Sequence, residues 1–371
     1  MIKALENLSD RITVHYENQP CYDIVYSDSF ENITAELEKN NIKNRKLCIV
    51  TESNVAPLYA EEFKRILEPC CKKVIIHEFP AGEQYKNVST VNNIYETRIV
   101  NHFDRKDMLL ALGGGVTGDI TGFAAATYLR GIDFVQIPTT LLAQVDSSIG
   151  GKTGVDFKAY KNMVGAFYMP KLVYMNLSTL NSLPEREYLQ GMGEVIKHGI
   201  IRDSEYFYWL KENVSGIFNK DFHTLKQLLF VSCNIKRNVV ENDPKELNER
   251  ALLNFGHTIG HAVEKVTDFS LLHGECVSVG INAASYLSME KGLIDENTYR
   301  DILNVLETFK LPLTVKNIPS EQVVSATLND KKMDGGIIKF ILTDKIGNAL
   351  ISRDVSKADL LKSVEKVINH E

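Results

Sequence analysis

The sequence lacks any run of basic residues, and its 371 residues carry a formal net charge of −6. Proteins bind nucleic-acid backbones and anionic membrane surfaces through clustered lysine and arginine, so we expect neither as a partner. The chain also lacks an uninterrupted apolar stretch of about 20 residues, the length that spans a bilayer. Its N-terminal residues contain no apolar signal core. These absences predict a cytoplasmic location.

Cysteine is scarce and poorly spaced for disulfide or metal chemistry. The six cysteines form no C-x-x-C pair, and Cys70 and Cys71 are adjacent. This pattern favours free thiols in a reducing compartment over a disulfide or zinc–thiolate framework. Hydrophobic residues make up 44% and charged residues 24% of the chain, as in ordinary globular proteins. A chain of this length has room for two domains.

The order of apolar patterns divides the chain into two parts. Up to about residue 180, strand and helix patterns alternate, which predicts an α/β domain at 1–180 with a mostly parallel, Rossmann-like sheet. The expected strands are 11–15, 22–26, 46–50, 73–77, 107–112, 134–137 and 173–176, and the expected helices are 30–39, 56–67, 88–101 and 120–128. Helical periodicity then dominates, at 185–201, 204–215, 222–240, 249–266, 274–291 and 296–307. Apart from a lysine-bearing loop and late hairpin from Asp330, we expect an all-α domain at 181–371.

Histidines cluster in the second part. His257 and His261 are four residues apart and Glu264 follows three later, so in a helix all three side chains lie on one face. His273 follows in Leu-Leu-His-Gly-Glu. Upstream of the histidines, Glu194 and Lys197 lie one helical turn apart. Imidazoles with one carboxylate are the usual protein ligands of a catalytic zinc. The spacing alone allows either His257 or His261 to bind the metal, and it is not the H-E-x-x-H of metalloproteases.

A glycine-rich turn in the first part suits a nucleotide. Residues 113–119 satisfy G-x-G-x-x-G between the buried strand 107–112 and a helix expected from Ile120. Glycines there let backbone N–H groups approach a pyrophosphate at a helix N-terminus. The acidic residue expected about 20 positions further on is not clear, since Asp133 is nearer. Nucleotide binding therefore need not follow the standard Rossmann geometry.

A second glycine-rich loop, 146–156, contains Lys152 but not the spacing of a Walker A motif. Flexible backbone donors with one point charge suit a phosphate. Together with Arg130 and Lys161, this loop predicts an anionic substrate. Thr139 and Thr140 directly follow a strand, where open α/β sheets bind ligands.

Taken together, these motifs resemble the 3-dehydroquinate synthase family, within the sugar phosphate cyclases. The matching pieces run from Gly-Glu-Gln-Tyr-Lys at 82–86 to the Asp-Lys-Lys loop at 330–332. Between them lie Gly-Gly-Gly-Val-Thr-Gly-Asp, Arg-Gly-Ile, Pro-Thr-Thr-Leu-Leu-Ala, Asp-Ser-Ser-Ile-Gly-Gly-Lys-Thr, Lys-Asn-Met-Val-Gly-Ala-Phe, Gly-Glu-Val-Ile-Lys, Asn-Phe-Gly-His-Thr-Ile-Gly-His-Ala and Leu-His-Gly-Glu. The resemblance implies the dehydroquinate synthase-like fold, with an NAD-binding and a metal-binding domain, and a homodimer.

The resemblance also implies roles for individual residues. The ligands of zinc, or cobalt, would be Glu194, His257 and His273, which leaves His261 to transfer protons. The catalytic residues would be His261, Lys197, Lys152, Asn254, Arg250 and Lys236. The substrate contacts would be Arg130, Asp146, Lys152, Asn162, Lys197, Lys236, Arg250, Asn254, His261 and Lys332, or Lys331 in its place. NAD would contact Glu83, Lys86, Gly114, Gly115, Val116, Asp119, Thr139, Thr140, Asp146, Lys152, Lys161, Thr179, Leu183 and Glu187.

The reaction implied by the resemblance converts 3-deoxy-D-arabino-heptulosonate 7-phosphate, a phosphorylated keto acid, into 3-dehydroquinate and phosphate. It belongs to the shikimate pathway of aromatic amino acid biosynthesis. Its course is transient NAD-dependent oxidation, phosphate elimination, re-reduction, ring opening and intramolecular aldol closure. NAD is regenerated, and the flexible substrate must be held in place throughout.

Three other functions are compatible with some of the motifs. A cyclase that makes an aminocyclitol or valiolone precursor would share the architecture, but Lys152 and Lys236 favour a substrate with a carboxylate. An iron- or zinc-dependent alcohol dehydrogenase would consume NAD stoichiometrically. A non-catalytic metal- and nucleotide-binding protein would not need the intact set of Glu194, Lys197 and three histidines.

Overall fold

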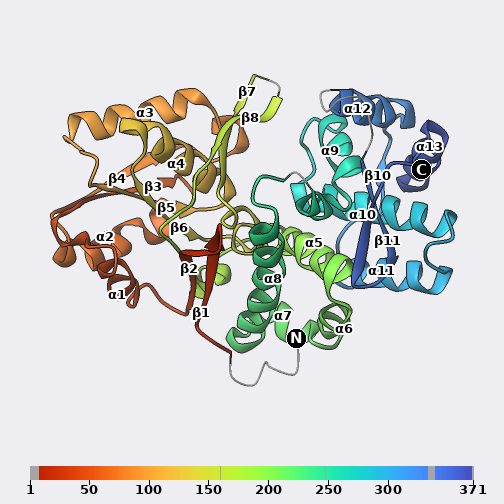
Figure 1. The fold of residues 1–371 in the computed structure, drawn as a ribbon, viewed down its shortest axis with the longest axis horizontal. Helices are drawn as coiled ribbons and strands as arrows, with labels where there is room; N and C mark the ends of the chain where they lie inside the picture. Colours follow the sequence, from red (N-terminus) through yellow and green to blue (C-terminus); the bar gives the residue numbers. More distant parts are fainter. Residues whose placement is uncertain (1–7, 159, 247, 333–338, 370–371) are drawn as a thin grey trace. The chain divides into compact units, whose positions relative to one another are not determined.

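The computed structural model describes the chain except residues 1–7, 159, 247, 333–338 and 370–371 (Figure 1). The described residues form two compact units, Leu8–Leu183 and a second unit that begins at Pro184. The division lies at Leu183 and Pro184, a few residues beyond the 180 expected from the patterns.

The first unit is built on a seven-stranded sheet, counted over the residues that the structure describes. Its strands are β1 (Arg11–Tyr16), β2 (Gln19–Ser27), β3 (Lys46–Glu52), β4 (Lys73–Phe79), β5 (Met108–Gly113), β6 (Asp133–Pro138) and β9 (Leu172–Asn176). They lie in the order β1-β2-β9-β6-β5-β3-β4, and every pairing except that of β1 with β2 is parallel. The predicted mostly parallel, Rossmann-like sheet is therefore confirmed, and the chain changes direction across the sheet between β3 and β5.

Helices cover both faces of this sheet (Figure 1). They are α1 (Ile33–Glu38), α2 (Glu61–Leu67), α3 (Val88–Val100) and α4 (Gly115–Thr127). Phe63 of α2 belongs to one buried apolar cluster, and Ile94 of α3 and Ile120 of α4 belong to another. Burial on both faces explains why β5 is apolar at nearly every position rather than alternating.

Two expectations for this unit were wrong. Helix α4 begins at Gly115 rather than Ile120. It contains Gly118 and Gly122, where a Cβ would meet Gln136 and Thr153 side-chain atoms at 2.5 and 2.4 Å, so these glycines allow close packing and do not mark a turn. Lys152 does not lie in a loop. It begins β7 (Lys152–Phe157), which pairs antiparallel with β8 (Tyr160–Phe167) in a separate hairpin.

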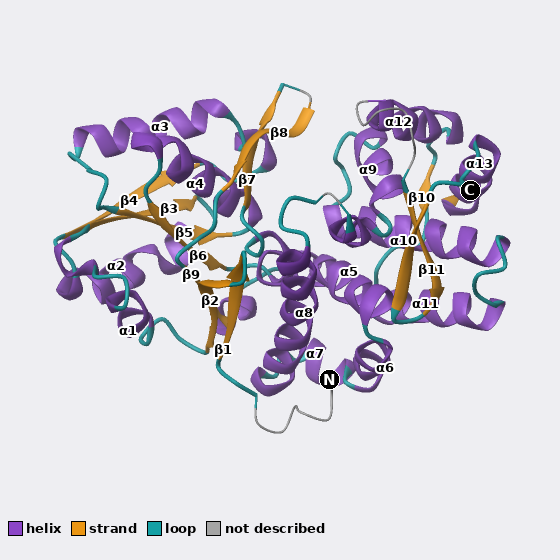
Figure 2. Cartoon of the chain, in the orientation of Figure 1, coloured by secondary structure: helices purple, strands orange, loops and turns teal. Residues whose placement is uncertain are grey.

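The second unit is mainly helical, as expected (Figure 2). Its helices are α5 (Glu185–Arg202), α6 (Ser204–Glu212), α7 (Val214–Phe218), α8 (Phe222–Asn242), α9 (His257–Val266), α10 (His273–Glu290), α11 (Glu296–Thr308), α12 (Ser320–Lys332) and α13 (Lys357–Val367). The predicted hairpin is β11 (Phe340–Lys345) with β12 (Asn348–Ser352), and β10 (Val315–Lys316) pairs with β13 (Ile368–Asn369). None of the described helices has the length and apolar character needed to cross a membrane.

The helix expected at 249–266 is interrupted. A 3₁₀ turn covers Glu249–Asn254, and Gly256 has a φ of 80° before α9 begins. A Cβ at Gly256 would lie 2.9 Å from the Val277 carbonyl oxygen, so glycine is required both for the backbone angle and for the close approach. The break makes His257 the first residue of α9.

Glycines also bring α5, α9 and α10 unusually close together. A Cβ at Gly193 of α5 would lie 2.7 Å from the carbonyl oxygen of Gly274 in α10. A Cβ at Gly260 of α9 would lie 2.8 Å from the carbonyl oxygen of Cys276 in α10. Backbone-to-backbone packing of this kind fixes the three helices that carry Glu194, His257 and His273.

Candidate metal centre and nucleotide loop

Glu194 is the centre of the polar cluster in the helical unit. It is fully buried on α5, and its Oε2 accepts from the ammonium of Lys197, one turn further along the same helix. Its Oε1 lies 3.4 Å from His257 Nε2 and 3.7 Å from His273 Nε2. Among the residues that the structure describes, this oxygen has no hydrogen-bond partner. One carboxylate thus faces an ammonium on one side and two imidazoles on the other.

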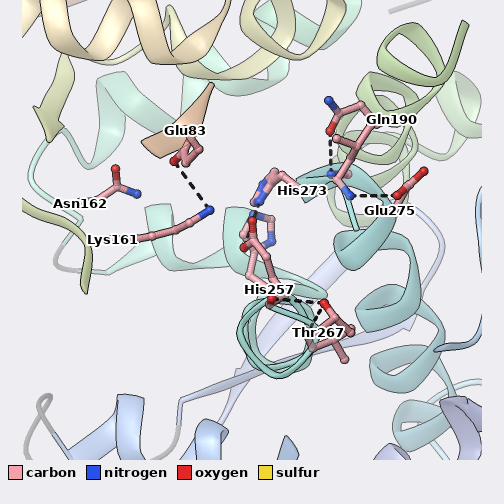
Figure 3. A network of polar contacts seen from close by, with 12 residues as sticks. Glu83, Lys161, Asn162, Gln190, His257, Thr267, His273 and Glu275 are labelled. Atoms are coloured by element: carbon pink, nitrogen blue, oxygen red, sulfur yellow. Dashed lines mark hydrogen bonds and ion pairs between the residues drawn. The ribbon is translucent and has the colours of Figure 1, made fainter. Parts of the chain in front are cut away.

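His257 and His273 come from the first residues of two different helices, α9 and α10 (Figure 3). Their ring centroids are 5.4 Å apart. His261 lies one turn along α9, with its ring 5.1 Å from that of His257 and 5.8 Å from that of His273. Nitrogen atoms of the three histidines lie within 4.8 Å of one another, so their arrangement alone also allows a three-histidine site. His261 is exposed, unlike the other two.

The charges of this cluster depend on one another. Burial opposes ionisation of Glu194, but Lys197 and the two imidazoles outweigh it, so its pKa lies well below the usual value. Burial, aided by the Lys197 charge, lowers the pKa of His257 well below 6.5. Burial also acts against protonation of His273, but Glu194 and Glu264 raise its pKa to about 9. At neutral pH and without a metal, the cluster therefore contains an ionised Glu194, a neutral His257 and a protonated His273, and a bound cation would displace the extra proton of His273.

The residues fit a divalent metal ion. A buried carboxylate oxygen without a hydrogen bond costs free energy unless a cation or donor faces it. The two Nε2 atoms approach that same oxygen at distances too long for good hydrogen bonds. Two imidazole nitrogens and one carboxylate oxygen form a common donor set for zinc, and an open position would remain for a substrate.

In the α/β unit, the predicted nucleotide residues follow the carboxyl ends of parallel strands. The residues after β5 are Gly114, which caps α4, and Gly115 and Val116, which begin it. Thr139 and Thr140 follow β6, and the Thr139 N–H donates to the Gly113 carbonyl at 3.0 Å. Parallel strands end at one edge of a sheet, so these loops gather there, and β5 lies at the switch in strand order.

The glycine turn fits a phosphate group. A Cβ at Gly114 would lie 3.2 Å from Thr140, and one at Gly115 would lie 3.0 Å from the Ser147 hydroxyl. Side chains at these positions would therefore press against Thr140 and Ser147, so glycine lets the turn lie close to both residues. The first N–H groups of α4 have no partner within the helix and can donate to an anion.

Several side chains that are predicted to contact NAD or the substrate contact one another in the structure. Lys86 is buried, and its Nζ lies 2.6 Å from Asp119 Oδ2 and donates to Asn162 Oδ1 at 2.6 Å. Burial lowers the pKa of Lys86, but the carboxylates of Asp119 and Glu83 outweigh burial and raise it. Lys161 Nζ lies 3.6 Å from Glu83 Oε1 (Figure 3). These contacts join the β7–β8 hairpin to the 83–86 segment and to α4.

The other predicted residues of the α/β unit lie on separate elements. Arg130 is exposed, with a φ of 69°, between Leu129 and Gly131, whose φ values are also positive. Asp146 lies in a π-helical turn, and Lys152 is exposed at the start of β7. Thr179 is buried after β9, and its hydroxyl donates to the Asn176 carbonyl at 2.7 Å. Leu183 ends the unit.

The remaining predicted residues belong to the helical unit. Glu187 of α5 accepts from Gln190 at 2.6 Å, and Lys236 is buried on α8. Arg250 is buried and donates to the Pro244 carbonyl at 2.8 Å. Asn254 donates to Glu246 at 3.0 Å. The predicted Lys332 and its alternative Lys331 end helix α12 rather than lying in a loop, and their side chains lie outside the described part of the structure.

Sequence reasoning missed Gln190, which connects two elements of the metal cluster. Its Oε1 accepts from the N–H of Gly274 at 3.1 Å, so it holds the start of α10, and with it His273, against α5 (Figure 3). A glutamine in an otherwise buried helix was the available signal. Its partner could not be inferred, because it lies far away in the sequence.

The parallel sheet with a glycine turn at its carboxyl edge and the helical unit with its carboxylate–histidine cluster have the fold of the class of sugar phosphate cyclases. The solved structure of 2-epi-5-epi-valiolone synthase from Streptomyces hygroscopicus subsp. jinggangensis 5008, with NAD+ and Zn2+ bound, has a TM-score of 0.86 to this chain. The two are 26% identical, and the match covers 96% of this chain and 99% of that one.

The particular family follows from closer relatives. The family models for the N-terminal and C-terminal parts of 3-dehydroquinate synthase match residues 76–190 and 191–333. The 3-dehydroquinate synthases of Acetivibrio thermocellus and Ruminiclostridium cellulolyticum are 44% and 42% identical to this chain, in each case over 98% of both chains. The chain belongs to the 3-dehydroquinate synthase family, and the resemblance seen in the sequence is confirmed.

Proposed function

We propose that this chain is a phosphate lyase that converts 3-deoxy-D-arabino-heptulosonate 7-phosphate into 3-dehydroquinate, with NAD and a divalent metal, zinc or cobalt, as cofactors. The observation that carries the proposal is the buried Glu194 Oε1, which lacks a hydrogen bond and faces two imidazole Nε2 atoms. The 44% identity to a 3-dehydroquinate synthase supports the substrate, and the NAD+ and Zn2+ bound to the valiolone synthase support the cofactors.

When bound, NAD supplies a hydride acceptor that is regenerated in the same turnover, and the metal supplies Lewis acidity toward a substrate hydroxyl. Glu194, His257 and His273 hold the metal. Lys197 keeps Glu194 ionised, because its ammonium contacts the other carboxylate oxygen. His261, which is exposed beside these ligands, transfers protons.

The cationic and amide side chains hold the substrate. Lys236 and Arg250 are buried, so their contacts to an anion would be little screened by solvent. Asn254, Lys152 and Asn162 add donors, and Arg130 binds phosphate. Holding a flexible keto acid in one pose through several steps lowers the entropic part of each barrier.

The decisive experiment measures phosphate release from purified protein with zinc, substrate and substoichiometric NAD. We expect many phosphate ions per NAD and no net NADH. NADH that accumulates in proportion to product would identify a dehydrogenase instead. A sugar phosphate without the carboxylate is the control substrate, and preferential turnover of that compound would favour a valiolone-type cyclase.

A second experiment separates the two histidines of α9. His257→Ala should lose stoichiometric zinc together with activity. His261→Ala should keep zinc and NAD but turn over about 10²–10⁴-fold more slowly, the usual contribution of a general acid–base. Metal analysis after dialysis decides the assignment, which would be reversed if only the His261 variant lost its zinc.

We also propose a homodimer in the cytoplasm. The β7–β8 hairpin exposes Phe157, Tyr160, Met163 and Phe167, each about half accessible in the single chain. Large apolar side chains gathered on one hairpin favour an interface with another protein surface. Sedimentation of the purified protein measures the oligomeric state directly.

A further inference from the structure

We propose that Glu264 is a positioning residue for His273: it accepts the Nδ1 proton of that imidazole and so directs Nε2 toward the metal. The proposal rests on the function proposed above, because it assigns His273 as a metal ligand. Glu264 completes the polar stripe of α9 that begins with His257 and His261, and neither the metal set nor the substrate set includes it.

The position of Glu264 is unusual for a carboxylate. It is 5% exposed, and its Oε2 lies 3.9 Å from His273 Nδ1. On the other side of the same ring, Nε2 lies 3.7 Å from Glu194 Oε1. One imidazole therefore lies between two buried carboxylates, one on α9 and one on α5.

His257 has an equivalent arrangement. Its Nδ1 lies 3.2 Å from the carbonyl oxygen of Phe255, and its Nε2 lies 3.4 Å from Glu194 Oε1. Both imidazoles thus direct Nε2 toward the same carboxylate oxygen and place Nδ1 beside an acceptor. For His257 the acceptor is a backbone carbonyl, and for His273 it is Glu264.

This arrangement determines which nitrogen can bind a cation. Once the imidazole has lost its second proton, an acceptor beside Nδ1 keeps the remaining proton there and leaves the Nε2 lone pair available. Carboxylate partners of this kind orient a ligating histidine and increase its basicity. The 3.9 Å separation is that of an ion pair rather than a formed hydrogen bond. The proposal therefore requires the pair to close when His273 binds the metal.

The test measures zinc affinity of the metal-free protein by competition with a chromogenic chelator, without NAD or substrate. Glu264→Ala should weaken zinc binding by about 10–100-fold, the usual effect of losing such a partner. Glu264→Gln, which keeps the size and one acceptor oxygen, should recover part of the loss. Glu290→Ala is the control variant, because Glu290 pairs with Lys362 near the far end of α10, the helix that begins with His273. This variant should bind zinc with the affinity of the wild type.

The outcomes separate this proposal from the proposed function. If the wild-type protein binds no zinc or cobalt, the metal assignment itself fails. If the wild type binds zinc and the Glu264 variants bind it equally tightly, only the role of Glu264 is refuted. A variant with a lower melting temperature in its metal-free form but wild-type zinc affinity would show that Glu264 is merely structural, which also overturns the proposal.

Discussion

Gly274 is the contact point between α10 and α5, and we predict that Gly274→Ala destabilises the helical unit and weakens metal binding. The alanine Cβ would overlap the carbonyl group of Gln190, which belongs to the α5 backbone and cannot rotate away. The start of α10 would have to move, and His273 is the adjacent residue. The Gly274 N–H would also lose its 3.1 Å bond to Gln190 Oε1.

The magnitude follows from these two effects. Inserting a methyl group into a close-packed contact costs about 1–3 kcal/mol, and losing the hydrogen bond adds about 0.5–1.5 kcal/mol. The free energy of unfolding should therefore fall by roughly 2–4 kcal/mol. At ~2–4 °C for each kcal/mol in a domain of this size, the melting temperature should fall by on the order of 10 °C.

Thermal unfolding of the metal-free protein and zinc titration together test this reasoning. Gly216→Ala is the control, because the three atoms nearest to its Cβ would belong to the side chain of Thr224 and not to the backbone of another helix. That variant should melt within a few degrees of the wild type and bind zinc normally. If Gly274→Ala shows the wild-type melting temperature and zinc affinity, the contact does not position His273 and the argument is wrong.

Two further predictions concern the α/β unit. Lys86→Met should lower the free energy of unfolding by about 1–3 kcal/mol, because it leaves the partly buried Asp119 without its cation. Adding Asp119→Asn should restore part of the loss, as equilibrium denaturation would show. Burial lowers the pKa of His77 below 6.5 in the folded state, so the unfolded chain takes up the proton first. The His77 contribution is therefore complete above about pH 6.5 and is lost as the pH falls toward the lowered value. His77→Gln should therefore lose less stability than the wild type between pH 8 and pH 5. If both proteins lose the same free energy of unfolding over this range, His77 does not contribute to acid sensitivity.

Features set by local periodicity could be predicted from the sequence. The strand and helix patterns of residues 11–137 gave the parallel sheet, because alternation and helical spacing are properties of neighbouring residues. The face shared by His257, His261 and Glu264 needed only the helical repeat. The glycine turn after β5 was found for the same reason, since its strand and its glycines are contiguous.

Features that depend on contacts between distant residues could not be predicted from the sequence. The glycine at 118 inside α4 reflects the approach of Gln136 from β6, and the glycine at 256 reflects the approach of α10. The sequence places Lys152 beside glycines, which resembles a loop, whereas its pairing with Phe167 makes it a strand residue. Likewise, nothing near Glu264 in the sequence indicates that it faces His273 rather than solvent.

Several polar residues that we assign to the metal, NAD or the substrate already have partners within the protein. Lys197 contacts Glu194, Lys86 contacts Asp119, and Asn254 contacts Glu246. A buried charge without a partner would cost several kcal/mol, so a folded protein that must bind charged ligands there has to supply temporary partners itself. Binding then exchanges one set of contacts for another, and the net gain for each contact is smaller than its strength in isolation.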